Sequence, residues 1–160
     1  MLGLLFKKKE KIVEFKSPIV GEVVALTDVP DEVFASKMVG DGIAFKPDEG
    51  ALFAPVSGRI VQVFPTKHAI GLETKEGLEV LIHIGINTVE MKGEGFRSFV
   101  CKNQWVEAGD KIMEFDLDLI EKSGRSTIIP VIITNMDNVK SIEIHDGKVT
   151  LQTTVMKVKL

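Results

Sequence analysis

Short apolar segments with almost no helical periodicity are the feature of this sequence that most limits its fold. They are rich in Val and Ile and end at Gly, Pro, Asp or Asn, which is typical of β-strands bounded by turns. The segments are residues 21–26, 58–64, 69–74, 79–86, 111–116, 130–134 and 149–160. Many short strands at this spacing predict an all-β sandwich or barrel.

Two segments depart from the β pattern and are expected to be short helices. Residues 30–38 carry acidic side chains in the first turn, where the positive end of the helix dipole favours them. Residues 116–124 begin at Asp116, a suitable N-cap, and end at Gly124, a suitable C-terminal stop.

We expect one domain over residues 17–160, preceded by a tail of residues 1–16. The chain has 160 residues, which suits one hydrophobic core, and no low-complexity linker divides it. Residues 17–26 and 54–63 share a pattern of small residue, Pro, two residues, Gly and then a strand, which suggests two similar hairpin units. The tail is expected to be disordered or weakly amphipathic, with residues 1–12 making at most peripheral contact with anionic lipid.

Charge and cysteine content limit the function classes. The net charge is −3, which does not favour nucleic-acid binding. The single cysteine, Cys101, excludes an internal disulfide and fits a reducing compartment. No apolar run approaches the roughly 20 residues that span a bilayer. We therefore expect a cytoplasmic protein.

The segment 79–86 contains a histidine, His83, within an otherwise apolar strand. Side chains alternate between the two faces of a strand. Alternation assigns Val80, Ile82, Ile84 and Ile86 to the core face, and Leu81, His83, Gly85 and Asn87 to the other. Because Gly85 has no side chain, we expect it to leave His83 uncovered on one side.

A second histidine, His68, is expected to lie beside His83. Residues 68–74 and 79–86 are separated by a short turn in which Gly77 can take a positive φ. Antiparallel pairing about this turn sets His68 opposite residue 83 or 84, where Cβ atoms lie about 4.5 to 5.5 Å apart. Such a pair suits bonding to nearby carbonyls, a metal site or nucleophilic catalysis by a neutral imidazole. No HxH or HExxH motif accompanies it, so a complete metal site is not visible.

Five motifs together are typical of one protein family. They are "HIGINTVEMKGEGF" (83–96), "PTKHAIGL" (65–72), "VPDEVFASKMVGDGIA" (29–44), "APVSG" (54–58) and "PVIITN" (130–135). In them the chain resembles the glucose-type enzyme IIA proteins of the bacterial phosphoenolpyruvate-dependent sugar phosphotransferase system. The resemblance extends from about residue 17 to near the end. It implies an antiparallel β-sandwich of the duplicated hybrid motif type.

The resemblance also implies a phosphoryl relay in sugar uptake through a phosphohistidine. His83 would accept phosphate from the phosphocarrier HPr and pass it to a cysteine on the IIB domain of a glucose-type sugar permease. His68 would stabilise the phosphoryl group, and Thr66 would orient His68. No metal or other cofactor is expected.

An apolar docking patch around the histidines is implied as well. Family-like positions for partner binding are Asp31, Val33, Phe34, Met38, Val39, Phe64, Leu81 and Asn87. Phe34, on a short polar helix, is expected to be exposed, and Asp31 to belong to an acidic rim. The family commonly has Asp where this chain has Asn87, which keeps the shape and removes the charge.

Three other functions have weaker support. A regulatory relative would bind permeases or kinases without relaying phosphate. A zinc endopeptidase on a related fold would need HxH and a separate His-x-x-x-Asp, and the sequence has neither. A biotinyl or lipoyl carrier would explain "VEAGDKI" (106–112), but its modified lysine motif is missing.

Overall fold

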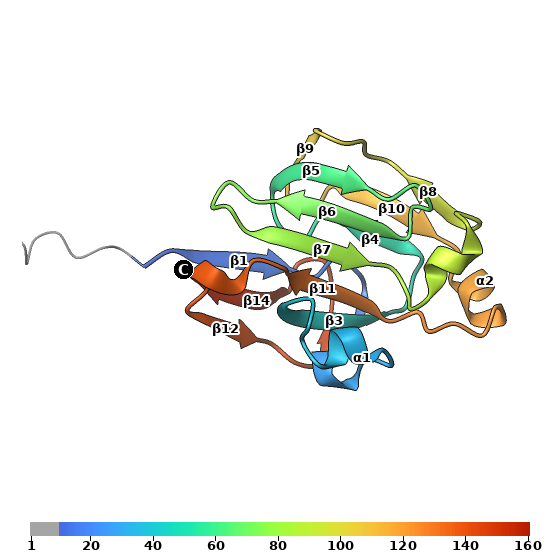
Figure 1. Ribbon diagram of the computed structural model, residues 1–160, viewed down its shortest axis with the longest axis horizontal. Helices are drawn as coiled ribbons and strands as arrows, with labels where there is room; N and C mark the ends of the chain where they lie inside the picture. The colour runs from blue at the N-terminus through green and yellow to red at the C-terminus, as the bar shows by residue number, and fades with distance from the viewer. Residues whose placement is uncertain (1–9) are drawn as a thin grey trace, which may run out of the picture.

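The expected all-β architecture is confirmed. The computed structural model describes residues 10–160, which form fourteen strands in antiparallel sheets and two short α-helices (Figure 1). The strands are β1 Ile12–Lys16, β2 Gly21–Val24, β3 Asp41–Pro47, β4 Ala51–Phe53, β5 Gly58–Val63, β6 Ala69–Glu73, β7 Glu79–His83, β8 Phe96–Ser98, β9 Trp105–Val106, β10 Lys111–Phe115, β11 Ile129–Ile133, β12 Ser141–Ile144, β13 Lys148–Val149 and β14 Thr154–Lys159. The helices are α1 Glu32–Ala35 and α2 Leu117–Lys122, with 3₁₀ turns η2 Leu26–Asp28, η3 Thr88–Met91 and η4 Met136–Asn138.

Three sheets build the sandwich. The largest has eight strands in the order β13-β2-β3-β11-β7-β6-β5-β9, and the others are β4-β10-β8 and β1-β14-β12. The main core includes fully buried side chains from β6, β7, β4 and β10: Ile70, Leu72, Ile82, Leu52 and Ile112. The core face expected for β7 is confirmed through Ile84, since Val80, Ile82 and Ile84 are all buried in this cluster.

The other face of the large sheet is partly covered as well. The segment between β2 and β3, which carries η2 and α1, buries Leu26, Val29 and Phe34. They form a smaller apolar cluster with Ala44 of β3 and Ile132 of β11. Strands β3 and β11 are therefore buried on both faces, which explains the continuous apolar sequence of β11. Figure 1 shows α1 beside β3.

Both expected helices are present, and α1 is shorter than residues 30–38. The Asp31 side chain caps α1 by accepting a hydrogen bond from the Val33 N–H at 2.9 Å. Lys37 has φ of 62°, which ends helical geometry soon after Ala35. Asp116 caps α2 by accepting from the Leu119 N–H, and Gly124 follows with φ of 81°.

Two sequence-based boundaries differ from the structure. The tail expected over residues 1–16 is too long, because β1 pairs with β14 and buries Val13 and Phe15. The strand expected over 149–160 is interrupted by a turn between β13 and β14. The lipid contact expected for residues 1–12 falls mainly on residues 1–9, outside the described residues. From residue 10 onward, no helix is both long and apolar enough to cross a membrane.

The inclusion of β1 in the fold can be tested by truncating one buried side chain. Phe15 is 1% exposed, so Phe15→Ala should lower the free energy of unfolding by about 3–5 kcal/mol. Ile12 on the same strand is 56% exposed, so Ile12→Ala should change it by less than about 0.5 kcal/mol. Urea unfolding measures both variants. Equal, small effects would show that β1 does not contribute to the cooperative core.

Candidate functional site

The turn between β5 and β6 places Thr66 and His68. Pro65 follows Phe64 and restricts φ, and the Lys67 N–H donates to the Phe64 carbonyl at 2.7 Å. Lys67 then takes a φ of 57°, which reverses the chain into β6. The Thr66 hydroxyl reaches Nδ1 of His68 at 2.5 Å, so the expected pairing of Thr66 with His68 is present.

The β6–β7 hairpin brings the two histidines together, as the sequence predicted. Ala69 pairs with His83, so His68 lies opposite Ile84 in the continued register. The Ile84 N–H donates to the His68 carbonyl at 2.7 Å, which extends the pairing beyond the strands. The imidazole centroids lie 5.0 Å apart with the ring planes at 75°.

Gly85 has a different role from the one that strand alternation predicted. Strand β7 ends at His83, and Gly85 has φ of 74°, so alternation stops before this residue. Ile86 consequently joins the smaller cluster with Phe34, and Asn87 lies exposed in a turn with φ of 59°. The expectation that Gly85 uncovers His83 from the same strand face is therefore wrong.

The turn at Gly85 directs its carbonyl back to the histidine ring. This oxygen lies 2.6 Å from Nδ1 of His83. A side chain is excluded at Gly85, since a Cβ would lie 2.5 Å from Cγ2 of Thr88 and 2.9 Å from the Ser126 carbonyl oxygen. A carbonyl only accepts, so neutral His83 carries its proton on Nδ1 and its lone pair on Nε2.

The imidazoles are both held toward the neutral form. Burial lowers the pKa of His68 to about 4, and the neighbouring charge of His83 adds to the effect. Burial also lowers the pKa of His83, while the Gly85 carbonyl and the Asp31 carboxylate oppose that shift. At neutral pH the pair therefore offers a nucleophilic nitrogen without a positive charge on either ring.

Two phenylalanines line the histidine pair. Phe34 packs on His83 with 5.2 Å between ring centroids, and Phe64 packs edge-on against His68 at 5.4 Å. Phe34 is buried at 8% exposure, so the expectation that it is an exposed docking residue is wrong. Its hydrophobic side chain supports the smaller cluster instead.

The rest of the expected patch varies in exposure. Val33 is 47% exposed and Met38 is 76% exposed, which makes them the prominent apolar side chains of the segment over the large sheet. Asn87 is exposed, whereas the partly buried members are Asp31, Val39, Phe64 and Leu81.

Sequence reasoning missed Arg125, which contacts the turn after His83. Its Nε donates to the Asn87 carbonyl at 3.0 Å, and its Nη2 reaches Oε2 of Glu90 at 2.9 Å. Arg125 is 38 residues from Asn87 in sequence, and no local motif connects them.

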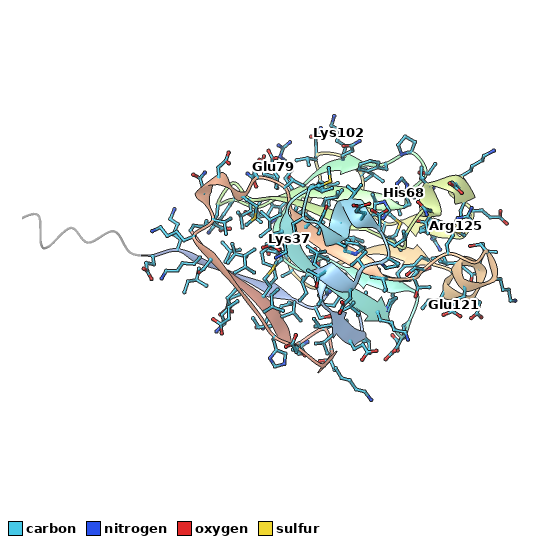
Figure 2. All side chains as sticks on the ribbon, turned by 60° about the horizontal axis from the view of Figure 1, so that its bottom comes forward. Lys37, His68, Glu79, Lys102, Glu121 and Arg125 are labelled. Carbon is cyan, nitrogen blue, oxygen red and sulfur yellow. The ribbon has the colours of Figure 1, made fainter. Side chains whose placement is uncertain are left out.

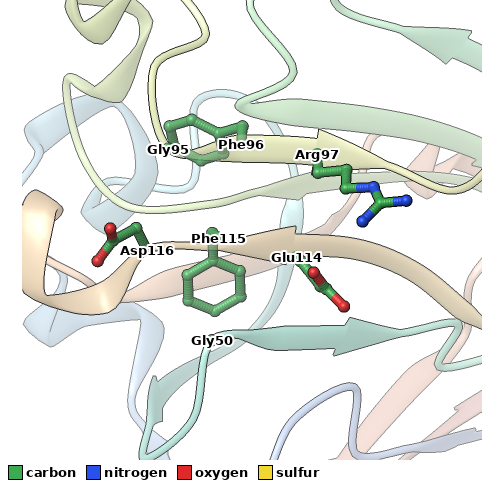
Figure 3. Close-up of a pocket in the computed structure, with 7 residues that line it drawn as sticks. All are labelled: Gly50, Gly95, Phe96, Arg97, Glu114, Phe115 and Asp116. Carbon is green, nitrogen blue, oxygen red and sulfur yellow. The ribbon is translucent and has the colours of Figure 1, made fainter.

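A separate hollow lies away from this site. It has a volume of about 410 Å³ and is lined by residues near the ends of β4, β8 and β10, including Arg97 and Glu114 (Figure 3). None of the predicted site residues lines it. Within residues 10–160, no group of three or more His, Cys, Asp or Glu side chains is arranged to hold a metal ion.

Comparison with known proteins finds one family over most of the chain. Residues 13–139 match the family model described as phosphoenolpyruvate-dependent sugar phosphotransferase system, EIIA 1. A glucose-specific EIIA component from Bacillus cereus is 47% identical, covering 100% of this chain and 97% of its own. A counterpart from Staphylococcus aureus is 44% identical over 91% of this chain and 88% of its own. The solved structure of glucose permease IIA from Mycoplasma capricolum has a TM-score of 0.88 and 42% identity, covering 92% of this chain and 96% of that one.

The depressed pKa of His68 predicts a pH dependence of stability. Between the ordinary value of 6.5 and about 4, the unfolded chain binds a proton at this position that the folded chain rejects. The free energy of unfolding should therefore fall as the pH falls through this window. His68→Gln should reduce this slope in urea unfolding. The lowered pKa of His68 would be contradicted if His68→Gln left the pH dependence of the free energy of unfolding unchanged. It would also be contradicted if NMR showed the wild-type His68 ring titrating near 6.5.

Proposed function

Because this chain belongs to the EIIA 1 family of the phosphoenolpyruvate-dependent sugar phosphotransferase system, we propose that His83 is its phosphoryl acceptor. The chain is a phosphotransferase component that serves sugar uptake, like the glucose-specific EIIA components it matches. His83 receives the phosphoryl group from phosphorylated HPr. It then passes the group to the cysteine of a IIB domain in a glucose-type sugar permease.

The observation that carries this proposal is the hydrogen bond from His83 Nδ1 to the Gly85 carbonyl, beside a second imidazole. This bond at 2.6 Å occupies one ring nitrogen and leaves the lone pair on the other. The ring centroid of His68 lies 5.0 Å from that of His83, so His68 is well placed to contact a group on that nitrogen. A neutral nucleophile with an adjacent donor is the arrangement that phosphoryl transfer needs.

The transfer exchanges one N–P bond for another. The lone pair on Nε2 of His83 attacks phosphorus as the N–P bond to the donor histidine breaks, and that bond's electron pair returns to the donor ring. The proton stays on Nδ1 of His83. The phosphorylated ring then carries positive charge, which the Gly85 carbonyl stabilises. In the second step the Nε2–P bond breaks as a cysteine thiolate forms an S–P bond.

His68 stabilises the phosphoryl oxygens in this scheme. When the Thr66 hydroxyl donates to Nδ1 of His68, the neutral ring carries its proton on Nε2. That N–H can donate to a phosphoryl oxygen as charge develops. Thr66 thus sets the tautomer of His68, and Gly85 sets that of His83.

Partners dock on the apolar surface around the two histidines. Val33 and Met38 supply the exposed apolar area, while the phenylalanines beside the rings limit water access to the phosphohistidine. Asp31 and Asn87 lie at the border of this surface. Asp31 supplies the negative charge for steering a basic partner, and Asn87 contributes hydrogen bonding only.

The acceptor role is tested by reconstitution with phosphoenolpyruvate, enzyme I and HPr, followed by intact mass measurement. The wild-type chain should gain one acid-labile phosphate, and His83→Gln should gain none. His68→Gln should accept phosphate but pass it to a IIB domain about 10²- to 10³-fold more slowly, because a positioned donor is lost. If His83→Gln gains phosphate at the wild-type level, His83 is not the acceptor. If His68→Gln passes phosphate to the IIB domain at the normal rate, only the role of His68 in stabilising the phosphoryl group is disproved.

The docking surface is tested by placing a charge on it. Met38→Asp should weaken HPr binding roughly tenfold, because the carboxylate must be desolvated at the interface. Ile12→Asp is the matched control, since Ile12 is also an exposed apolar residue and lies on β1. Calorimetric titration with HPr measures both. If the two variants bind equally, Met38 does not belong to the interface.

A further inference from the structure

We propose that Arg125 is a positioning residue for phosphoryl transfer, which it serves by holding the turn that orients His83. The inference rests on the proposed acceptor role of His83. Arg125 lies between α2 and β11, and in Figure 2 it is found toward the same end of the molecule as His68. It has no sequence proximity to either histidine.

The guanidinium holds both ends of the turn that follows Ile86. Its Nε donates to the Asn87 carbonyl at 3.0 Å, and its Nη2 pairs with the Glu90 carboxylate at 2.9 Å. The Glu90 N–H also donates to the Asn87 carbonyl, so the three residues form a closed set of contacts. The planar fork of arginine suits two acceptors at once, and the single ammonium of lysine does not.

This turn needs external support because its first residue, Asn87, adopts left-handed geometry with a φ of 59°. Asn in this region is tolerated but uncommon, and such conformations persist where the surroundings hold them. The neighbouring Ser126 contributes as well, since its carbonyl accepts from the Ile86 N–H at 3.0 Å.

The contacts of Arg125 and Ser126 with this turn affect His83 through the carbonyl of Gly85. Gly85 lies between the end of β7 and the residues held by the 125–126 segment. Its oxygen is the group that bonds Nδ1 of His83. The Ile86 N–H of the same peptide unit is held by the Ser126 carbonyl, next to Arg125 in the chain. Loss of the Arg125 contacts would loosen both Asn87 and the 125–126 segment, so the Gly85 peptide could rotate and weaken the contact that fixes the ring's tautomer and orientation. Arg125 acts through this backbone path and not by contact with the ring.

If Arg125 only stabilised the folded chain through its surface ion pair, a different experimental result would be expected. The Arg125 side chain is 24% exposed and that of Glu90 is 65% exposed, and ion pairs with this exposure contribute little to stability. A purely structural role would therefore leave the state of the His83 ring unchanged.

The test is Arg125→Gln, with the His83 ring nitrogens observed by ¹⁵N NMR and phosphoryl transfer from HPr measured by rapid quench. Wild-type neutral His83 should be in the Nδ1–H form. The variant should show a mixed population with the Nε2–H form and transfer about three- to tenfold more slowly. Arg125→Lys should restore the rate only in part, because one ammonium cannot hold both acceptors.

Arg59→Gln is the matched control, since Arg59 also contacts two partners at the surface, Asn103 and Glu73. It should retain the wild-type tautomer and rate. The proposal is overturned if Arg125→Gln keeps the Nδ1–H form, whatever its rate, or transfers at the wild-type rate. The ring measurement uses the unphosphorylated chain, so it gives an answer even if His83→Gln shows that another residue accepts phosphate.

Discussion

The hydrogen bond between Nδ1 of His83 and the Gly85 carbonyl is the contact on which the proposed chemistry depends. It requires a backbone oxygen to turn back toward a side chain two residues earlier, and an extended strand cannot do this. The positive φ of Gly85 makes that reversal possible, and the close approach of Thr88 and Ser126 excludes any larger residue. The end of β7 is thus as important to the site as the strand itself.

The large sheet makes this contact rigid. One of its faces belongs to the main core, and part of the other is covered by the segment that carries α1. His83 is the last residue of β7, and Phe34 from the covering segment packs against its ring. The imidazole of His83 is partly buried for this reason, and the neighbouring His68 is buried at 6% exposure. Rigid support and partial desolvation therefore arise from the same packing.

The sequence was sufficient to predict which residues share a face within regular strands. It was insufficient where the backbone departs from regular strand geometry. Alternation predicted the buried face of β7 through Ile84, and turn placement predicted that His68 and His83 meet, because both depend on short-range geometry. Alternation failed at Gly85 and Ile86, where a positive φ ends the period of two. The burial of Phe34 and the contact of Arg125 depend on how distant segments pack, and neither has a local sequence signal.

The histidine environment balances two opposing requirements. Attack on phosphorus needs a neutral ring, and burial supplies it by lowering the pKa of both histidines. In the proposed transfer, the phosphorylated His83 ring carries positive charge, which burial alone would disfavour. The Gly85 carbonyl and the Asp31 carboxylate both act in the opposite direction on His83. With an uncharged Asn87 on the adjacent turn, Asp31 is the carboxylate that provides this compensation, so its position at the start of α1 connects the cap of that helix to the chemistry of the ring.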